Sequence, residues 1–179
     1  MLYLPAGSGA TLLGMAERRA FHLEVEDDHS VSNEDEPMRR WRAGLPPLDP
    51  DNYPPDWKRW EDLTDAATGR GVALQRVRVV SEPLTEYIRF LHAVTDRNQA
   101  HGEEIRWMPR QNLDSAEVTA DEWWLLDDAA LAWTLFDQQG DFAGFAVTRD
   151  PFDVTRAMTV RDILWAKAIP HTDYIPGPQ

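Results

Sequence analysis

The sequence lacks cysteine, has only two lysines, and contains no long apolar run. Without cysteine, disulfides, thiolate catalysis and cysteine-ligated zinc are all excluded. No stretch approaches the roughly 18 apolar residues of a membrane span, and the first five residues lack the basic and apolar parts of a signal peptide. We therefore expect a cytoplasmic chain that does not enter a membrane.

Positive charge is also scarce, because 18 Lys and Arg face 31 Asp and Glu, for a net charge of −13. Such a balance argues against direct binding to nucleic acid or to an anionic membrane surface. The acids concentrate in residues 1–36 and 111–153, whereas residues 70–110 hold seven arginines. Two interpretations remain open: the arginines pair with acids inside the protein, or an acidic face meets a basic partner.

The middle of the chain gives the clearest structural pattern. The β-branched run 72–80 predicts a largely buried strand, and Pro83 is typical of the first turn of a following helix. Gly102 ends that helix, and residues 104–108 resume as a strand. Strand, helix and strand within about 35 residues form a βαβ unit, so the two strands should be parallel.

Other segments complete a mixed fold. Residues 20–26 alternate as a strand, and residues 122–127, 130–136 and 142–148 predict an antiparallel meander. Helices are expected at 11–19, 38–43 and 56–68 and from about residue 150 onward. The predicted class is α/β or α+β, a mixed β-sheet with one βαβ unit, a C-terminal antiparallel meander and helices packed on the sheet. Residues 1–19 are expected to form an arm and short helix, 20–174 a single α/β domain, and 175–179 a tail.

Recognisable catalytic and cofactor motifs are missing. The Gly7-Ser8-Gly9 sequence lacks the rest of a phosphate-binding loop, and the five histidines show no metal-binding spacing. Ser81 does not stand in a G-x-S-x-G elbow, so capping explains it better than nucleophilic attack. The sequence predicts no catalytic residue, metal or cofactor.

A site is most reasonably sought at the carboxyl end of the strand 72–80, where ligands bind to open sheets with parallel strands. Acidic residues in the first turn of the next helix oppose an anion, so a cationic or hydrogen-bonding ligand fits better. Structural pairing of the buried arginines with nearby carboxylates is the alternative. The candidate ligand-binding residues are Arg78, Ser81, Glu82, Tyr87, Arg106, Asp127, Asp128 and Arg161.

Eight tryptophans are an unusually large share for 179 residues. Trp41, Trp57 and Trp60 fall in peripheral helices, where aromatic side chains would serve a partner interface. Core packing is the alternative for all three.

The run RVRVVSEPLTEYIRF at residues 76–90 resembles the signature of a family of uncharacterised actinobacterial proteins, a domain of unknown function. The resemblance continues through residues 102–106, 124–128 and 150–151 and through Arg161, Asp162, Trp165 and Ala168, and it covers residues 20–174. It implies no activity. Members are often encoded beside helix-turn-helix regulators, which implies a regulatory or toxin–antitoxin-like role.

The C-terminal half also bears a fainter similarity to half of a phospholipase-D-like fold. That superfamily's catalysis needs H-x-K-x4-D, and neither Lys58 nor Lys167 follows a histidine by two residues. The similarity therefore implies no shared chemistry.

Two functional hypotheses follow. The first is a non-catalytic regulatory protein that binds a protein partner, a basic helix-turn-helix regulator, through its acidic surface and exposed tryptophans. The second is a small-molecule sensor or unrecognised enzyme with a polar site at the end of the strand 72–80. The sequence does not predict an oligomeric state.

Overall fold

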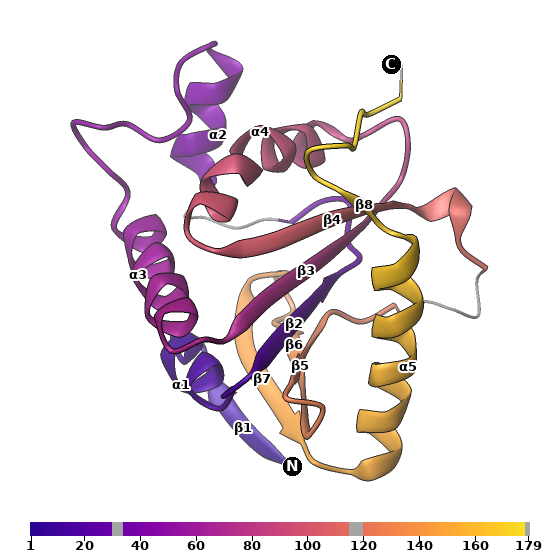
Figure 1. Cartoon of the computed structure of the whole chain (residues 1–179). Helices are drawn as coiled ribbons and strands as arrows, with labels where there is room; N and C mark the ends of the chain where they lie inside the picture. The colour runs from indigo at the N-terminus through magenta and orange to yellow at the C-terminus, as the bar shows by residue number, and fades with distance from the viewer. Residues whose placement is uncertain (30–33, 115–119, 178–179) are drawn as a thin grey trace.

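The computed structural model describes residues 1–29, 34–114 and 120–177. Within these residues the chain forms an eight-stranded mixed sheet with helices on both faces (Figure 1). This confirms the predicted fold class. Residues 30–33 of the expected acidic loop and residues 178 and 179 of the expected tail lie outside the described residues.

The strands run in the spatial order β1-β7-β6-β5-β2-β3-β4-β8. Their bounds are β1 Leu2–Pro5, β2 Arg19–Glu24, β3 Ala73–Val80, β4 Glu103–Pro109, β5 Trp123–Leu126, β6 Ala130–Phe136, β7 Phe142–Thr148 and β8 Ile169–Pro170. The helices are α1 Gly9–Gly14, α2 Asp35–Arg42, α3 Pro55–Gly69, α4 Glu86–Ala100 and α5 Pro151–Lys167, and a 3-10 turn, η2, spans Arg110–Asn112.

The strands β2, β3 and β4 form the parallel part of the sheet, and β8 pairs antiparallel with β4 at its edge. β3 pairs in parallel with β2 on one side and with β4 on the other, so the βαβ unit predicted around α4 is confirmed and a second parallel pair precedes it. The Thr85 hydroxyl caps α4 by accepting the backbone N–H of Ile88 at 3.2 Å, which satisfies one of the free donors at the helix start. The carboxyl ends of β2, β3 and β4 therefore meet at a single edge.

The other part contains the predicted antiparallel meander of β5, β6 and β7. Its first turn consists of Asp127 and Asp128, which have φ values of 53° and 59°. Positive φ at both central residues is the geometry of the two-residue hairpin turn, and aspartate tolerates it better than most residues. β5 also pairs antiparallel with β2 and so joins the two parts.

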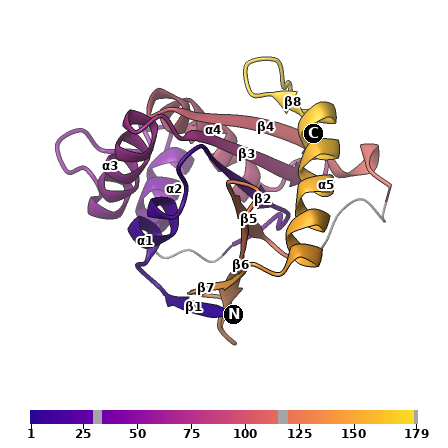
Figure 2. The ribbon, with the colours of Figure 1, turned by 60° about the horizontal axis from the view of Figure 1, so that its bottom comes forward.

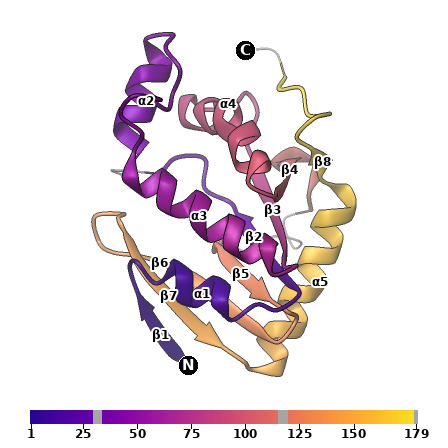
Figure 3. The same cartoon turned by 60° about the vertical axis from the view of Figure 1, so that its left-hand side comes forward.

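The N-terminal residues do not form the loose arm that the sequence suggested. β1 pairs antiparallel with β7, and Leu4 lies opposite Phe145 (Figure 3). A side chain at Gly144 would collide with the carbonyl oxygen of Leu4, so the close approach of these strands requires glycine there. The expected helix at 11–19 is also shorter, since α1 ends at Gly14.

Helices cover the two faces of the sheet separately. Figure 2 shows α1 and α3 on one side of the sheet and α5 on the other. Leu74 and Trp124 pack in the apolar cluster with α1 and α3, whereas Val77 and Trp123 pack in the cluster with α5. The adjacent rings of Trp123 and Trp124 thus point to opposite faces, as strand geometry requires. α4 covers the same face as α3, over Val80 of β3. None of the described helices has the length and apolar character needed to cross a membrane.

Candidate functional site

The edge formed by the carboxyl ends of β2, β3 and β4 carries an unusual set of charged side chains on the face beneath α3 and α4. Glu24 lies at the end of β2, and Arg76 and Arg78 occupy alternate positions of β3. Alternate positions of a strand point to the same face. The β-branched run that predicted a buried strand therefore also buries two guanidinium groups.

Together with Glu103 of β4, these residues form what we call the buried ionic cluster. Arg76 donates to Glu24 and to Glu103 at 2.6 Å each, and Arg78 Nε donates to Glu24 at 2.5 Å. Arg78 also donates to the Thr95 hydroxyl at 2.9 Å. Two arginines and two carboxylates balance in charge, which is what makes their burial tolerable.

Neighbouring charges decide the ionisation of this cluster. Burial favours the neutral form of Glu24, but the charges of Arg76 and Arg78 outweigh burial and hold its pKa well below the ordinary value. Burial opposes the charge of Arg76 as well, yet Glu103 and Glu24 raise its pKa. His22, stacked on the Trp124 ring at 4.1 Å, has its pKa lowered to about 3, mainly by burial. These shifts favour the charged forms of Glu24 and Arg76 and the neutral form of His22 beside them.

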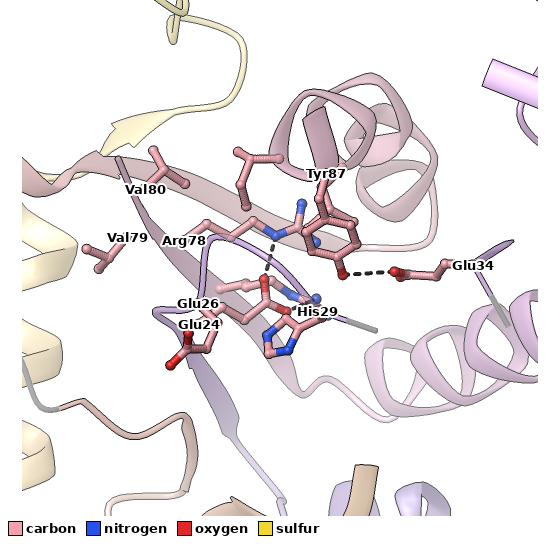
Figure 4. A pocket seen from close by; sticks show the side chains of 11 residues that line it. Glu24, Glu26, His29, Glu34, Arg78, Val79, Val80 and Tyr87 are labelled. Atoms are coloured by element: carbon pink, nitrogen blue, oxygen red, sulfur yellow. Dashed lines mark hydrogen bonds and ion pairs between the residues drawn. The ribbon is translucent and has the colours of Figure 1, made fainter. Parts of the chain in front are cut away.

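A small cavity of about 60 Å³, which we call the chamber, opens beside the cluster. Side chains of Arg78, His29, Glu34 and Tyr87 converge on it from β3, from the loop after β2, from the start of α2 and from α4 (Figure 4). The Tyr87 hydroxyl donates to Glu34 at 2.8 Å. Burial raises the pKa of Glu34, and burial together with the Glu34 charge raises that of Tyr87. The chamber is a polar space with room for a few water molecules.

A larger groove of about 410 Å³, which we call the acidic groove, adjoins the chamber and shares Glu26 and His29 with it. Its other walls come from the segment before β5 and from the β6–β7 hairpin. Among its described lining residues, four side chains are carboxylates, and His29 is the one side chain that can become cationic. The lining residues are Glu26, Asp28, His29, Ala120, Asp121, Glu122, Thr134, Phe136 and Gly140.

Glu122 connects two walls of the groove through hydrogen bonds. Its Oε1 accepts the backbone N–H groups of Val25 at 3.0 Å and Glu26 at 3.2 Å and lies 3.1 Å from Nε2 of His29. Burial alone would lower the pKa of His29, but the hydrogen bond and charge of Glu122 raise it above the ordinary value. The His29 ring also stacks on Phe136 at 5.2 Å. The loop after β2 is thus tied to the start of β5.

The predicted site residues divide among several places, and four of the eight lie at this edge. Arg78 and Tyr87 line the chamber. Ser81 lies nearby, where its backbone N–H and hydroxyl both donate to Asp27, at 2.8 and 2.6 Å. Glu82 accepts hydrogen bonds from Tyr174 at 2.7 Å and from the side-chain amide of Gln111 at 2.6 Å.

The other four residues do not share this rim, which corrects our expectation of one common site. Arg106 lies opposite Val77 and therefore points to the α5 face, where its guanidinium stacks 3.9 Å from the Trp165 ring. β5 runs antiparallel to β2, so Asp127 and Asp128 at its end lie at the opposite edge of the sheet. Arg161 pairs there with Asp128.

The three candidate partner-binding tryptophans are half-buried rather than exposed. Trp41 and Trp57 pack against the apolar cluster around α4, and the Trp41 and Phe90 rings are 6.1 Å apart. Trp60 packs near Trp124, and its indole N–H donates to Glu103 at 2.8 Å. Core packing, the alternative interpretation, describes them better than an exposed surface does.

Sequence reasoning missed the residues that build the two cavities: Glu24, Glu26, Asp28, His29, Glu34, Arg76 and Glu122. The alternation of residues 20–26 already placed Glu24 on one side of a strand, but the pairing of β2 with β3 was not foreseen. Nothing in the local sequence joins Glu122 to Val25, because they are 97 residues apart. Within the described residues, no group of three or more histidine, aspartate or glutamate side chains is placed to hold a metal ion.

Comparison with known proteins adds a family but no activity. No curated protein matches the chain. A family model described as a domain of unknown function, DUF6879, matches residues 9–176, which includes every strand except β1. The resemblance seen in the sequence is thereby confirmed as far as membership of an uncharacterised family: this chain belongs to the DUF6879 family.

Proposed function

We propose that this chain is a non-catalytic regulatory protein that binds a basic protein partner through the acidic groove. The observation that carries the proposal is the charge of that groove, where Glu26, Asp28, Asp121 and Glu122 face a single histidine. The net charge of −13 favours a basic partner by long-range attraction. A helix-turn-helix regulator, whose DNA-binding surface is basic, is the partner class we propose.

The internal ion pairing of Arg76 and Arg78 supports the same proposal. Arg76 and Arg78 pair with Glu24 and Glu103 in the interior. Their positive charge is therefore compensated inside the protein and does not offset the acids of the groove. The rim carboxylates of Glu26 and Asp28 are exposed and form no ion pair with the described residues.

The alternative hypothesis, a small-molecule sensor at the end of the strand 72–80, has weaker support. The chamber at that position measures about 60 Å³, whereas metabolite pockets usually occupy about 300 Å³ or more. The acidic groove is large enough, but its carboxylates suit a cation-rich surface better than most metabolites.

The test is a capture experiment with nuclease-treated lysate of the native host at low salt. The immobilised chain is compared with the double variant Glu26→Gln/Asp28→Asn and with Glu17→Gln/Asp173→Asn, a control that makes the same charge change at exposed positions away from the groove. We expect a basic protein to bind the unmodified chain and the control and to be lost from the groove variant. Equal retention by all three proteins would overturn the proposal.

A further inference from the structure

The floor of the acidic groove contains Glu122, whose two carboxylate oxygens differ in the hydrogen bonds that they receive from the described residues. Glu122 is only 5% exposed. Its Oε1 receives the hydrogen bonds from Val25, Glu26 and His29, whereas Oε2 receives none from any described residue. Glu122 lines the groove, and a carboxylate oxygen that faces a groove can accept an N–H group of a bound molecule in a charge-assisted hydrogen bond.

The neighbourhood of this oxygen is polar and negative. The backbone N–H of Thr134 donates to the carbonyl of Glu122 at 2.9 Å, so the two residues are adjacent on the floor. The Thr134 hydroxyl is buried and has no partner among the described residues. Glu26, Asp28 and Asp121 add three carboxylates around the floor, and His29 is the one titratable base among the described lining residues.

An aromatic wall stands beside the floor. Phe136 is 38% exposed, and its ring stacks on that of His29 with an interplanar angle of 21°. An exposed aromatic face next to carboxylates attracts a cation by its ring quadrupole. A flat cation gains most from such a wall, since it can stack on the ring while its edge donates hydrogen bonds.

Among biological cations, the guanidinium group fits these features best. It is planar, is always charged and carries five N–H donors in a fixed fork, whereas an ammonium is a compact and strongly hydrated point charge. We infer that the acidic groove receives the guanidinium of an arginine side chain from the protein partner, with Glu122 Oε2 as its acceptor and Phe136 as its stacking surface. This inference rests on the proposed function and adds the group that the groove selects.

Calorimetric titration with two synthetic peptides tests the inference. Both peptides carry flanking lysines; one has a central arginine and the other has citrulline, which has nearly the same shape but no charge. We expect the arginine peptide to bind about tenfold more tightly or better, the range for a hydrogen bond to a charged group. In Glu122→Gln this difference should disappear, and in the control Glu36→Gln, which alters an exposed glutamate of α2, it should persist.

The same titration separates the inference from the proposed function. Equal binding of both peptides to the unmodified chain would overturn the arginine assignment and leave the basic-partner proposal standing, whereas binding of neither would count against both. Agmatine, a free guanidinium compound, is the third probe. If agmatine binds as tightly as the arginine peptide, the groove serves a small molecule and the assignment to a protein side chain is wrong.

Glu122→Gln alters a residue that also holds two backbone N–H groups, so its unfolding curve must be measured in parallel. Phe136→Leu provides a second variant at an exposed position that leaves those hydrogen bonds intact. We expect it to reduce the preference for arginine over citrulline by several-fold through loss of stacking. An unchanged preference in Phe136→Leu would contradict the proposed geometry.

Discussion

The buried ionic cluster and the acidic groove lie side by side at one edge of the sheet, yet their carboxylates serve different purposes. Glu24 is held between two arginines beneath the helices, while Glu26, two residues further along the chain, is exposed on the groove rim. The two residues have the same chemistry and nearly the same place in the sequence. What separates them is whether the described part of the fold supplies a cation: it pairs Glu24 with Arg76 and Arg78 and gives Glu26 no ion pair.

The largest expected effect comes from Glu24→Gln. Among the described residues, Arg78 would lose its one carboxylate partner and Arg76 one of two, and breaking a buried ion pair costs about 3–5 kcal/mol. Urea denaturation of Glu24→Gln and Glu26→Gln measures the contrast directly. Similar losses of unfolding free energy in the two variants would contradict our division between structural and free carboxylates.

A smaller but clear loss is expected for Asp127→Ala at the opposite edge. Asp127 accepts the backbone N–H groups of Glu17, Arg18 and Arg19 at 2.7 to 2.8 Å and has a positive φ. Losing those acceptors and placing alanine in the left-handed region should cost about 2–3 kcal/mol. Asp127→Asn retains one acceptor oxygen and tolerates the turn, so its loss should be smaller. Equal losses would mean that the acceptor oxygen and the turn preference that asparagine retains contribute little.

Acid should lower the free energy of unfolding through protonation of His22. Its pKa is about 3 in the folded protein against 6.5 for the free side chain, so between these values the unfolded chain binds a proton that the folded chain does not. The stability that neutral His22 contributes is fully present above pH 6.5 and is lost as the pH drops. Its loss lowers the free energy of unfolding by about 2 kcal/mol between pH 6.5 and pH 5.

His22→Phe keeps a ring against Trp124 and removes this titration. Urea denaturation at pH 7 and pH 5 should therefore give a smaller acid loss in the variant. Burial also lowers the pKa values of His92 and His171, so part of the loss should remain. An undiminished acid loss in His22→Phe would show that His22 is not held neutral by the fold.

The smallest effect on stability is expected in the groove itself. The double variant Glu26→Gln/Asp28→Asn removes two exposed charges that form no ion pair with the described residues, so unfolding free energy should change by less than about 0.5 kcal/mol. Thermal unfolding measures this. A large destabilisation would show that Glu26 and Asp28 stabilise the fold, as Glu24 does.

The sequence was sufficient for the elements whose signals are local. The β-branched run of β3 and the turn residues between β5 and β6 predicted a strand and the meander correctly. The helix after β3 was also expected, but Pro83 is not in its first turn, because α4 begins at Glu86 and is capped by Thr85. Periodicity and turn chemistry act over a few residues, so these predictions needed no knowledge of tertiary contacts.

The site was less predictable because it depends on strand order. Asp127 was placed beside Glu82 on the assumption of a shared edge, but the antiparallel pairing of β5 with β2 sends it to the other end of the sheet. Glu122 reaches Val25 for the same reason, through a pairing between distant segments. No local pattern encodes which strand lies next to which, so these residues could only be found in the folded protein.

The pairing of β1 with β7 has a consequence for how the protein is made. The Tyr3 hydroxyl bonds to the carbonyl of Ala143, 140 residues further along the chain. A ribosome releases the beginning of a protein long before its end, so β1 must wait unpaired until β7 emerges. Its exposed Leu2 and Tyr3 would then be a place where a chaperone, or a neighbouring nascent chain, can bind during synthesis.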